Sequence, residues 1–261
     1  PIHTADGTII ALLAAHPNDE HWEVDVMAEA MRAMEQAREK YDFMDREASH
    51  RRGNYPAVWS GISHGNGRQV STPPSPMSLP SPSPLHIFDR IHCSGTFGTF
   101  VPRLHAYYSD ILKVLAAWDP TLRLNFTNSV FAACTFNLGP DVTTLRHLDL
   151  KNLAWGWCAV TVLGTFDPRL GGHLVLWDMR LVIEFPLPSA VFAHSNTTIQ
   201  AGKKRLSFTQ YTAFGLFRWK EYGCMTTAQY TKKMGVLCVE QMNTSQWQAG
   251  MSMYSKLNEF I

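Results

Sequence analysis

The chain has 261 residues, 45% hydrophobic and 17% charged, a composition that excludes a disordered polymer and suits one large domain with additions. Its 23 basic and 22 acidic residues nearly cancel, so charge alone favours no polyanionic partner. The five cysteines form no C-x-x-C pair, which argues against a disulfide framework or a cysteine-ligated zinc site. We expect an intracellular, soluble monomer, since this cysteine usage suits a reducing compartment. Every apolar run is too short for a membrane span.

Residues 1–120 are predicted to form a helical layer. Between residues 18 and 49, apolar side chains recur every three or four positions, which is typical of an amphipathic helix packed on a sheet. A second helix is expected over residues 103–118, before an Asp-Pro pair. The stretch STPPSPMSLPSPSP is unsuited to sheet pairing, so we interpret residues 64–84 as a surface insertion.

Residues 121–222 are predicted to form a β-rich core. Six short β-type runs are separated by Gly, Pro and Asp turns: SVFAACTFNL, CAVTVLGTF, GGHLVLW, LVIEF, SAVFAHS and RLSFTQYTAF. Such a succession suggests an antiparallel sandwich or jelly roll. Residues 223–261 are expected to be a partly helical extension packed on this core. The sequence therefore predicts an α+β fold.

The stretch RHLDLKN at residues 146–152 places a histidine and an aspartate two positions apart. On a strand, His147 and Asp149 would point to the same side and offer two ligands to one metal ion. His194, at the end of a later predicted strand, would complete the 2-His-1-carboxylate face of non-haem Fe(II) oxygenases. Arg205 follows, and its planar fork suits the far carboxylate of 2-oxoglutarate. Alternatively, His194 caps a strand and Arg205 lies in solvent; the ordered set favours the oxygenase.

This pattern resembles that of Fe(II)/2-oxoglutarate dioxygenases with a double-stranded β-helix core. HLDLKN fits the H-x-D-x-x-N of the ten-eleven translocation (TET) and J-binding-protein group. WCAVTVLGTFDPRLGGHLVLWD and RLSFTQYTAFGLFRW resemble the basidiomycete fungal branch of that group. The resemblance spans residues 125–219 and is weak to absent in the tail. It implies a double-stranded β-helix, or jelly-roll, core over residues 121–222, flanked by N-terminal helices.

The resemblance also implies the cofactors and their ligands. Fe(II) would be held by His147, Asp149 and His194. Arg205 would anchor the C5 carboxylate of 2-oxoglutarate, with Ser207 as a helper. O2 would be the co-substrate, and a substrate methyl group would be hydroxylated while 2-oxoglutarate becomes succinate and CO2.

The implied substrate is 5-methylcytosine in double-stranded DNA, oxidised stepwise to 5-hydroxymethyl-, 5-formyl- and 5-carboxylcytosine after the base is extruded from the duplex. Asn152 falls where the family's asparagine contacts the flipped base, and Tyr211 lies where an aromatic residue follows R-x-S. Without the resemblance, Asn152 would simply terminate a strand and Tyr211 would belong to the core. A DNA substrate implies a nuclear location.

Other functions remain open at this point. N6-methyladenine in DNA is the main rival, because hydroxylation of its methyl group gives a hemiaminal that loses formaldehyde. A protein hydroxylase on the same fold and a catalytically dead, transposon-associated DNA-binding module are the others. The basic candidates for phosphate contacts are Arg51, Arg52, Lys151, Lys203 and Lys204.

The chain departs from the family pattern in two places. The cysteine-rich zinc-binding segments of animal TET members are missing, so DNA docking would use other residues. The stretch EFPLPSAVF is shorter than expected before the distal histidine, which leaves open whether residues are missing near 186–188. Neither departure changes the identity of the implied ligands.

Overall fold

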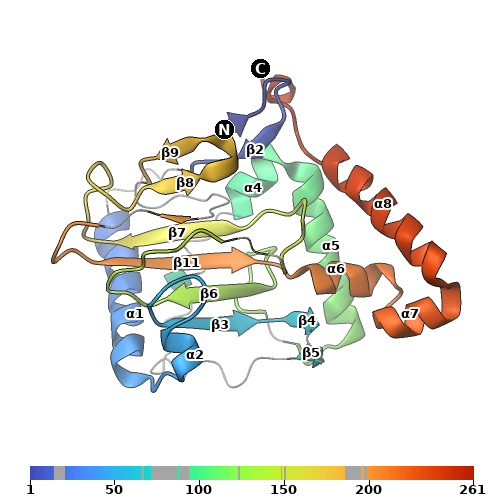
Figure 1. Cartoon of the computed structure of the whole chain (residues 1–261), viewed down its shortest axis with the longest axis horizontal. Helices are drawn as coiled ribbons and strands as arrows, with labels where there is room; N and C mark the ends of the chain where they lie inside the picture. The colour runs from blue at the N-terminus through green and yellow to red at the C-terminus, as the bar shows by residue number, and fades with distance from the viewer. Residues whose placement is uncertain are drawn as a thin grey trace.

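Four antiparallel strands form the main sheet (Figure 1). Their order across the sheet is β3 (Ala57–Gly61), β6 (Ala133–Asn137), β11 (Arg205–Tyr211) and β7 (Ala159–Gly164). The computed structural model describes residues 1–14, 21–65, 68–71, 87–88, 94–122, 124–147, 149, 151–185, 195–196 and 199–261. Within these residues the protein combines helices with antiparallel sheets, so the predicted α+β class is confirmed, whereas closure into a jelly roll stays a prediction.

A second, smaller antiparallel sheet lies beside β7 (Figure 1). Its strand order is β10 (Ser195–Asn196), β8 (Leu174–Leu176) and β9 (Leu181–Ile183). Five of the six predicted runs therefore contain a strand. The sixth, SAVFAHS, lies outside the described residues except for its last residue, which begins β10. Two short hairpins pair β1 (Ile2–His3) with β2 (Ile9–Ala11) and β4 (Ser63–Gly65) with β5 (Arg68–Ser71).

Helices surround the sheets. They are α1 (Ala28–Lys40), α2 (Asp45–Ala48), α4 (Ser94–Phe100), α5 (Pro102–Trp118), α6 (Phe214–Glu221), α7 (Thr227–Met234) and α8 (Val236–Ser252). A π-helical segment, Trp22–Met27, leads into α1, and 3-10 turns cover Trp177–Met179 and Leu257–Glu259. Within the part of the chain that is described, no helix is long and apolar enough to cross a membrane.

Alternation along the strands gives the main sheet two faces. Leu206 and Phe208 of β11 pack with Met34 of α1 in a buried apolar cluster, which we call the α1 cluster. This face of the sheet is therefore covered by α1. Arg205 and Ser207, one position out of phase, point to the opposite face, because successive strand residues alternate. Full burial of each large apolar side chain contributes roughly 1.5–3 kcal/mol. The α1 cluster therefore determines which residues of β11 face the candidate site.

The two predicted N-terminal helices are found, with different bounds for the first. The second helix, α5, ends at Trp118 as expected, and the carboxylate of Asp119 then accepts a hydrogen bond of 2.9 Å from the Thr121 backbone N–H. The first helix is shorter than predicted because the chain becomes extended at Tyr41. There, the ring centroids of Tyr41 and Phe43 lie 4.9 Å apart and both rings pack against the α1 cluster.

The main-sheet strand β3 was not predicted. It pairs with β6 along its whole length, from Ala57 opposite Asn137 to Gly61 opposite Ala133. The N-terminal 120 residues therefore contribute a strand as well as helices. The first part of the predicted insertion forms the β4–β5 hairpin, and the rest of its Pro/Ser-rich stretch, from residue 72, lies outside the described residues.

The C-terminal segment contains the helices α7 and α8 and returns to the core. Gly250 of α8 lies so close to the Trp155 ring that an added Cβ would be 2.3 Å from it. The Tyr254 hydroxyl donates a hydrogen bond of 3.1 Å to the carbonyl of Trp155. The Leu257 N–H donates one of 2.8 Å to the Gly7 carbonyl, and the two chain ends lie near each other (Figure 1).

Acidification is expected to release the C-terminal turn from α5. Arg103 donates two hydrogen bonds of 2.9 Å to the Glu259 carboxylate, and these lower the pKa of Glu259 from 4.5 to about 2. Because the pKa is lower in the folded state, the pair stabilises the fold above pH 4.5, and this contribution is lost as the pH falls from 4.5 through about 2. Amide hydrogen exchange of residues 254–261 should rise over that range.

The matched variant is Arg103→Gln, which removes the charge and keeps much of the side chain. Its residues 254–261 should exchange faster than those of the wild type already at pH 7, with a weaker dependence on acid. Identical exchange of the two proteins at every pH would show that this pair does not hold the turn.

Candidate active site

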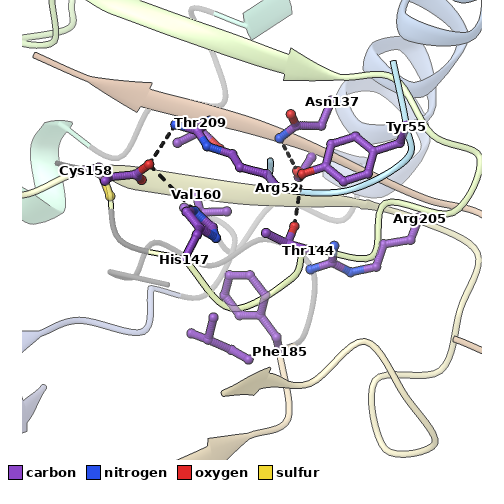
Figure 2. Close-up of a pocket in the computed structure, with 13 residues that line it drawn as sticks. Arg52, Tyr55, Asn137, Thr144, His147, Cys158, Val160, Phe185, Arg205 and Thr209 are labelled. Atoms are coloured by element: carbon purple, nitrogen blue, oxygen red, sulfur yellow. Dashed lines mark hydrogen bonds and ion pairs between the residues drawn. The ribbon is translucent and has the colours of Figure 1, made fainter. Parts of the chain in front are cut away.

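A pocket lies on the face of the main sheet that points away from α1 (Figure 2). It brings together four of the predicted site residues: His147, Asp149, Arg205 and Ser207. The other described residues that line it are Arg52, Tyr55, Asn137, Thr144, Cys158, Val160, Leu174, Phe185 and Thr209. They come from both sheets, from the chain before β3 and from the loop between β6 and β7.

His147 and Asp149 converge, although not through the predicted strand geometry. The backbone of both residues is irregular and belongs to the long connection from β6 to β7, so the expectation that they lie on a strand was wrong. A turn follows Asp149, closed by the Asn152 N–H, which donates to the Asp149 carbonyl at 2.9 Å. The Nε2 atom of His147 lies 3.6 Å from Oδ1 of Asp149.

The imidazole of His147 is oriented by the backbone. Its Nδ1 lies 2.8 Å from the Leu145 carbonyl oxygen, which only accepts hydrogen bonds, so Nδ1 carries a proton and, in the neutral imidazole, Nε2 carries the lone pair. Nε2 and the carboxylate oxygen then face each other as two electron-pair donors. Their separation of 3.6 Å exceeds a hydrogen bond but is shorter than two metal–ligand bonds of roughly 2 Å each. The pair is suited to share a cation.

Two arginines hold the Asp149 carboxylate. Nη2 of Arg52 donates to its Oδ1 at 2.7 Å, and Nη2 of Arg51 lies 3.6 Å from the same oxygen. The Arg52 carbonyl also accepts a hydrogen bond of 2.7 Å from the Leu145 N–H, which ties this segment to the histidine loop. Arg51 and Arg52, two of the basic candidates for phosphate contacts, both reach the candidate metal site, and Arg52 lines the pocket.

Arg205 is a buried cation at the opposite end of the pocket from His147 (Figure 2). Its residue is 2% exposed, and burial lowers its pKa to about 10. Nη1 donates a hydrogen bond of 2.6 Å to the Val142 carbonyl, whereas Nε has no hydrogen-bond partner among the described residues. No ion pair links it to a described acidic side chain. Since a buried charge without an ion-pair partner is costly, this end of the pocket is suited to accept an anion.

Ser207 lies on the same face of β11, two residues beyond Arg205. Its Oγ accepts a hydrogen bond of 2.8 Å from Nδ2 of Asn137, the residue directly opposite on β6. The hydroxyl hydrogen of Ser207 is therefore available to a ligand. The Oδ1 atom of Asn137 is buried and has no partner among the described residues, so it can accept a further hydrogen bond in the pocket.

The remaining predicted residues lie elsewhere. Asn152 is half-buried in the turn after Asp149 and forms an antiparallel bridge with Ala213, and Tyr211 ends β11 with its hydroxyl 3.5 Å from that of Thr135. Neither is among the described residues that line the pocket. His194 lies outside the described residues. Among those described, no group of three or more His, Cys, Asp or Glu side chains is placed to hold a metal.

Several residues were not predicted as part of the pocket. Arg52, named only as a candidate phosphate contact, and Tyr55 belong to the stretch HRRGNYP, far from the H-x-D motif in sequence. Asn137 ends a strand whose run was predicted without a site residue. The polar Asn137 at the end of the buried strand β6 could have indicated the pocket, because a buried polar side chain needs hydrogen-bond partners. The burial of Cys158 raises the pKa of its thiol to about 12, which keeps that pocket wall uncharged at neutral pH.

Comparisons with known proteins leave the family open. No protein-family model and no curated protein matches the chain. Among solved structures, NgTET1 in complex with 5mC DNA is similar with a TM-score of 0.44 and 12% identity, over 81% of this chain and 75% of that chain. A similarity of this size carries no argument about function, which therefore has to be argued from the chain's own residues.

Proposed function

We propose that this protein is an Fe(II)/2-oxoglutarate-dependent dioxygenase that oxidises methylated bases in DNA. The observation that carries the proposal is the buried Arg205 cation, whose Nε lacks a partner among the described residues, in the same pocket as the His147–Asp149 pair. A metal-binding pair and an anion-binding guanidinium at opposite ends of one pocket suit a metal ion with a dicarboxylate beside it.

The metal would be held by His147 and Asp149, with His194 as the third ligand. The residues that are described fit an iron site, because the His147 tautomer directs a lone pair toward the Asp149 carboxylate. Arg52 keeps that carboxylate in place through its hydrogen bond of 2.7 Å. This contact fixes the direction of the ligand oxygen before any metal arrives.

The dicarboxylate would lie between the two ends of the pocket. Arg205 would bind its far carboxylate through the guanidinium edge, and the Ser207 hydroxyl would donate to the same group. The apolar side chains of Val160, Leu174 and Phe185 would keep water away from its carbon chain. With Fe(II), 2-oxoglutarate and O2 bound, the site would supply oxidative decarboxylation to succinate and CO2 coupled to hydroxylation of a substrate C–H bond.

The proposed substrate is a methylated base in double-stranded DNA, with 5-methylcytosine preferred and N6-methyladenine as the alternative. Support for a base comes from the resemblance of HLDLKN to H-x-D-x-x-N, in which Asn152 follows the candidate metal ligands by one turn. A pocket sunk below the surface requires the base to be extruded from the duplex. Asn152 would read its edge, and Tyr211 would pack behind the pocket at the end of β11. Such a substrate would place the protein in the nucleus, and we propose that it acts there as a monomer.

The reaction type is tested by measuring succinate. Protein freed of metal and then supplied with Fe(II), ascorbate, O2 and 2-oxoglutarate should form succinate slowly, and faster when a methylated duplex is added. Mn(II) in place of Fe(II) should bind without supporting turnover. If Fe(II)-loaded protein forms no succinate with or without DNA, the dioxygenase proposal is wrong.

The variant Asn152→Ala is expected to separate base reading from cofactor chemistry. An amide offers one donor face and one acceptor face, so its loss should lower methyl oxidation by roughly 10- to 100-fold, in line with about 1–3 kcal/mol for one bidentate base contact. Slow succinate formation without DNA should be unchanged. Methyl oxidation and succinate formation are measured on the same preparation by mass spectrometry. Equal methyl oxidation by the variant and the wild type would show that Asn152 does not read the base.

A further inference from the structure

An exposed patch of arginine and aromatic side chains borders the pocket. We call it the rim and define it by Arg51, Leu145, Arg146 and Trp177. Leu145 is 60% exposed and Trp177 47%, and the side chain of Arg51 is 54% exposed. Arg146, which is also exposed, places its guanidinium carbon 5.1 Å from the centre of the Trp177 ring.

Backbone and side-chain contacts tie the rim to the site. Arg51 lies 3.6 Å from the Asp149 carboxylate, and the Leu145 carbonyl orients the His147 ring. Trp177 follows the end of β8, whose first residue, Leu174, lines the pocket. The turn that begins at Trp177 is closed by a hydrogen bond of 3.1 Å from the Arg180 N–H to the Trp177 carbonyl. This hydrogen bond fixes the backbone that carries the indole.

The chemistry of the rim selects a polyanion with flat rings. A guanidinium over an indole keeps its N–H edge directed outward, where it matches a phosphate. The indole itself offers apolar surface on which a base can stack, a contact that tolerates any base. The guanidiniums of Arg51 and Arg52 lie within 3.6 Å of the Asp149 carboxylate. That of Arg146 lies over the Trp177 ring, so these three cationic groups gather at this end of the pocket.

We infer that the rim binds the DNA strand that carries the target base. Arg51 and Arg146 contact backbone phosphates next to the extruded nucleotide, and Trp177 stacks on a neighbouring base that has lost its stacking partner. The inference rests on the proposed function, which requires a base to leave the duplex at this pocket. It adds that the rim, rather than the lysines at residues 151, 203 and 204, is the main DNA contact.

The test uses binding and uncoupled turnover as separate readouts. A short fluorescein-labelled duplex with one 5-methylcytosine is titrated with protein in the presence of Mn(II) and 2-oxoglutarate at several salt concentrations. Arg146→Gln should weaken binding roughly tenfold and reduce the slope of log affinity against log salt by about one. Trp177→Ala should weaken binding by a similar factor with an unchanged slope, and Trp177→Phe should restore most of it.

The matched controls are Arg38→Gln, an exposed arginine of α1 on the other side of the main sheet, and Trp247→Ala, a tryptophan of α8 that is 49% exposed. All variants should form succinate without DNA at the wild-type rate. Rim variants that bind the duplex as the controls do would overturn the inference, as would a wild type that forms succinate but binds no duplex. If the protein forms no succinate but its DNA binding still depends on the rim residues, the rim inference would hold and the dioxygenase proposal would be wrong.

Discussion

His147→Ala and Asp149→Ala are each expected to abolish succinate formation while the protein stays folded. The two side chains offer an imidazole lone pair and a carboxylate oxygen to a common point, with Nε2 and Oδ1 3.6 Å apart, so the loss of either removes a metal ligand. Their loop belongs to neither sheet, and the buried clusters on both sides of β11 contain neither residue. Metal binding should fall together with turnover.

Asp149→Ala also leaves Arg52 without its hydrogen-bonded partner. Their side chains are 27% and 31% exposed, so solvent screens the pair and its loss should lower the free energy of unfolding by only about 0–1 kcal/mol. The measurements are Mn(II) binding by calorimetry, succinate formation with Fe(II), and the thermal midpoint. A variant at either position that binds metal and turns over as the wild type does would disprove the ligand assignment.

Arg205→Ala is expected to reduce the affinity for 2-oxoglutarate by one to several orders of magnitude. Truncating one partner of a buried charge pair costs roughly 2–5 kcal/mol of binding free energy. In Arg205→Ala the guanidinium that would bind the far carboxylate of 2-oxoglutarate is lost. Arg205→Lys is the informative companion, because it keeps the charge but not the planar fork, and it should restore only part of the affinity. Metal binding should remain, since Arg205 lies at the other end of the pocket from His147 (Figure 2).

The same residue predicts a pH dependence. Burial lowers the pKa of Arg205 to about 10, and only the protonated guanidinium attracts the carboxylate. Affinity for 2-oxoglutarate in the wild type should therefore be constant near neutral pH and decline as the pH rises through about 10. Calorimetric titration with 2-oxoglutarate and Mn(II) gives both results, and an unchanged affinity in Arg205→Ala would assign this role to another residue.

The strands of the core could be predicted because their signals are local. The runs around β6, β7 and β11 alternate or are continuously apolar and end at Gly, Pro or Asp, and α5 has a clear start and end. By contrast, β3 lies in an N-terminal region whose residues were predicted to be helical. Its place at the sheet edge depends on pairing with a strand more than seventy positions away, which no local pattern encodes.

The sequence predicted several residues of the candidate site but not their geometry. The motif gave His147 and Asp149, and the structure joins them to Arg205 and Ser207 in one pocket. The strand geometry assumed for H-x-D was wrong because both residues lie in the irregular connection between β6 and β7. The contact of Arg52 with Asp149 was not predicted, because it spans 97 positions in the sequence.

Mass spectrometry of nucleosides tests most directly whether this pocket oxidises methylated DNA. Duplexes carrying 5-methylcytosine or N6-methyladenine are incubated at fixed salt with the protein, Fe(II), ascorbate and 2-oxoglutarate, then digested, with Asp149→Ala as the inactive control. We expect 5-hydroxymethyl-, 5-formyl- and 5-carboxylcytosine from the wild type alone, with slower loss of N6-methyladenine. Succinate formation with both bases unaltered would contradict a DNA substrate, and the absence of both would contradict the dioxygenase itself.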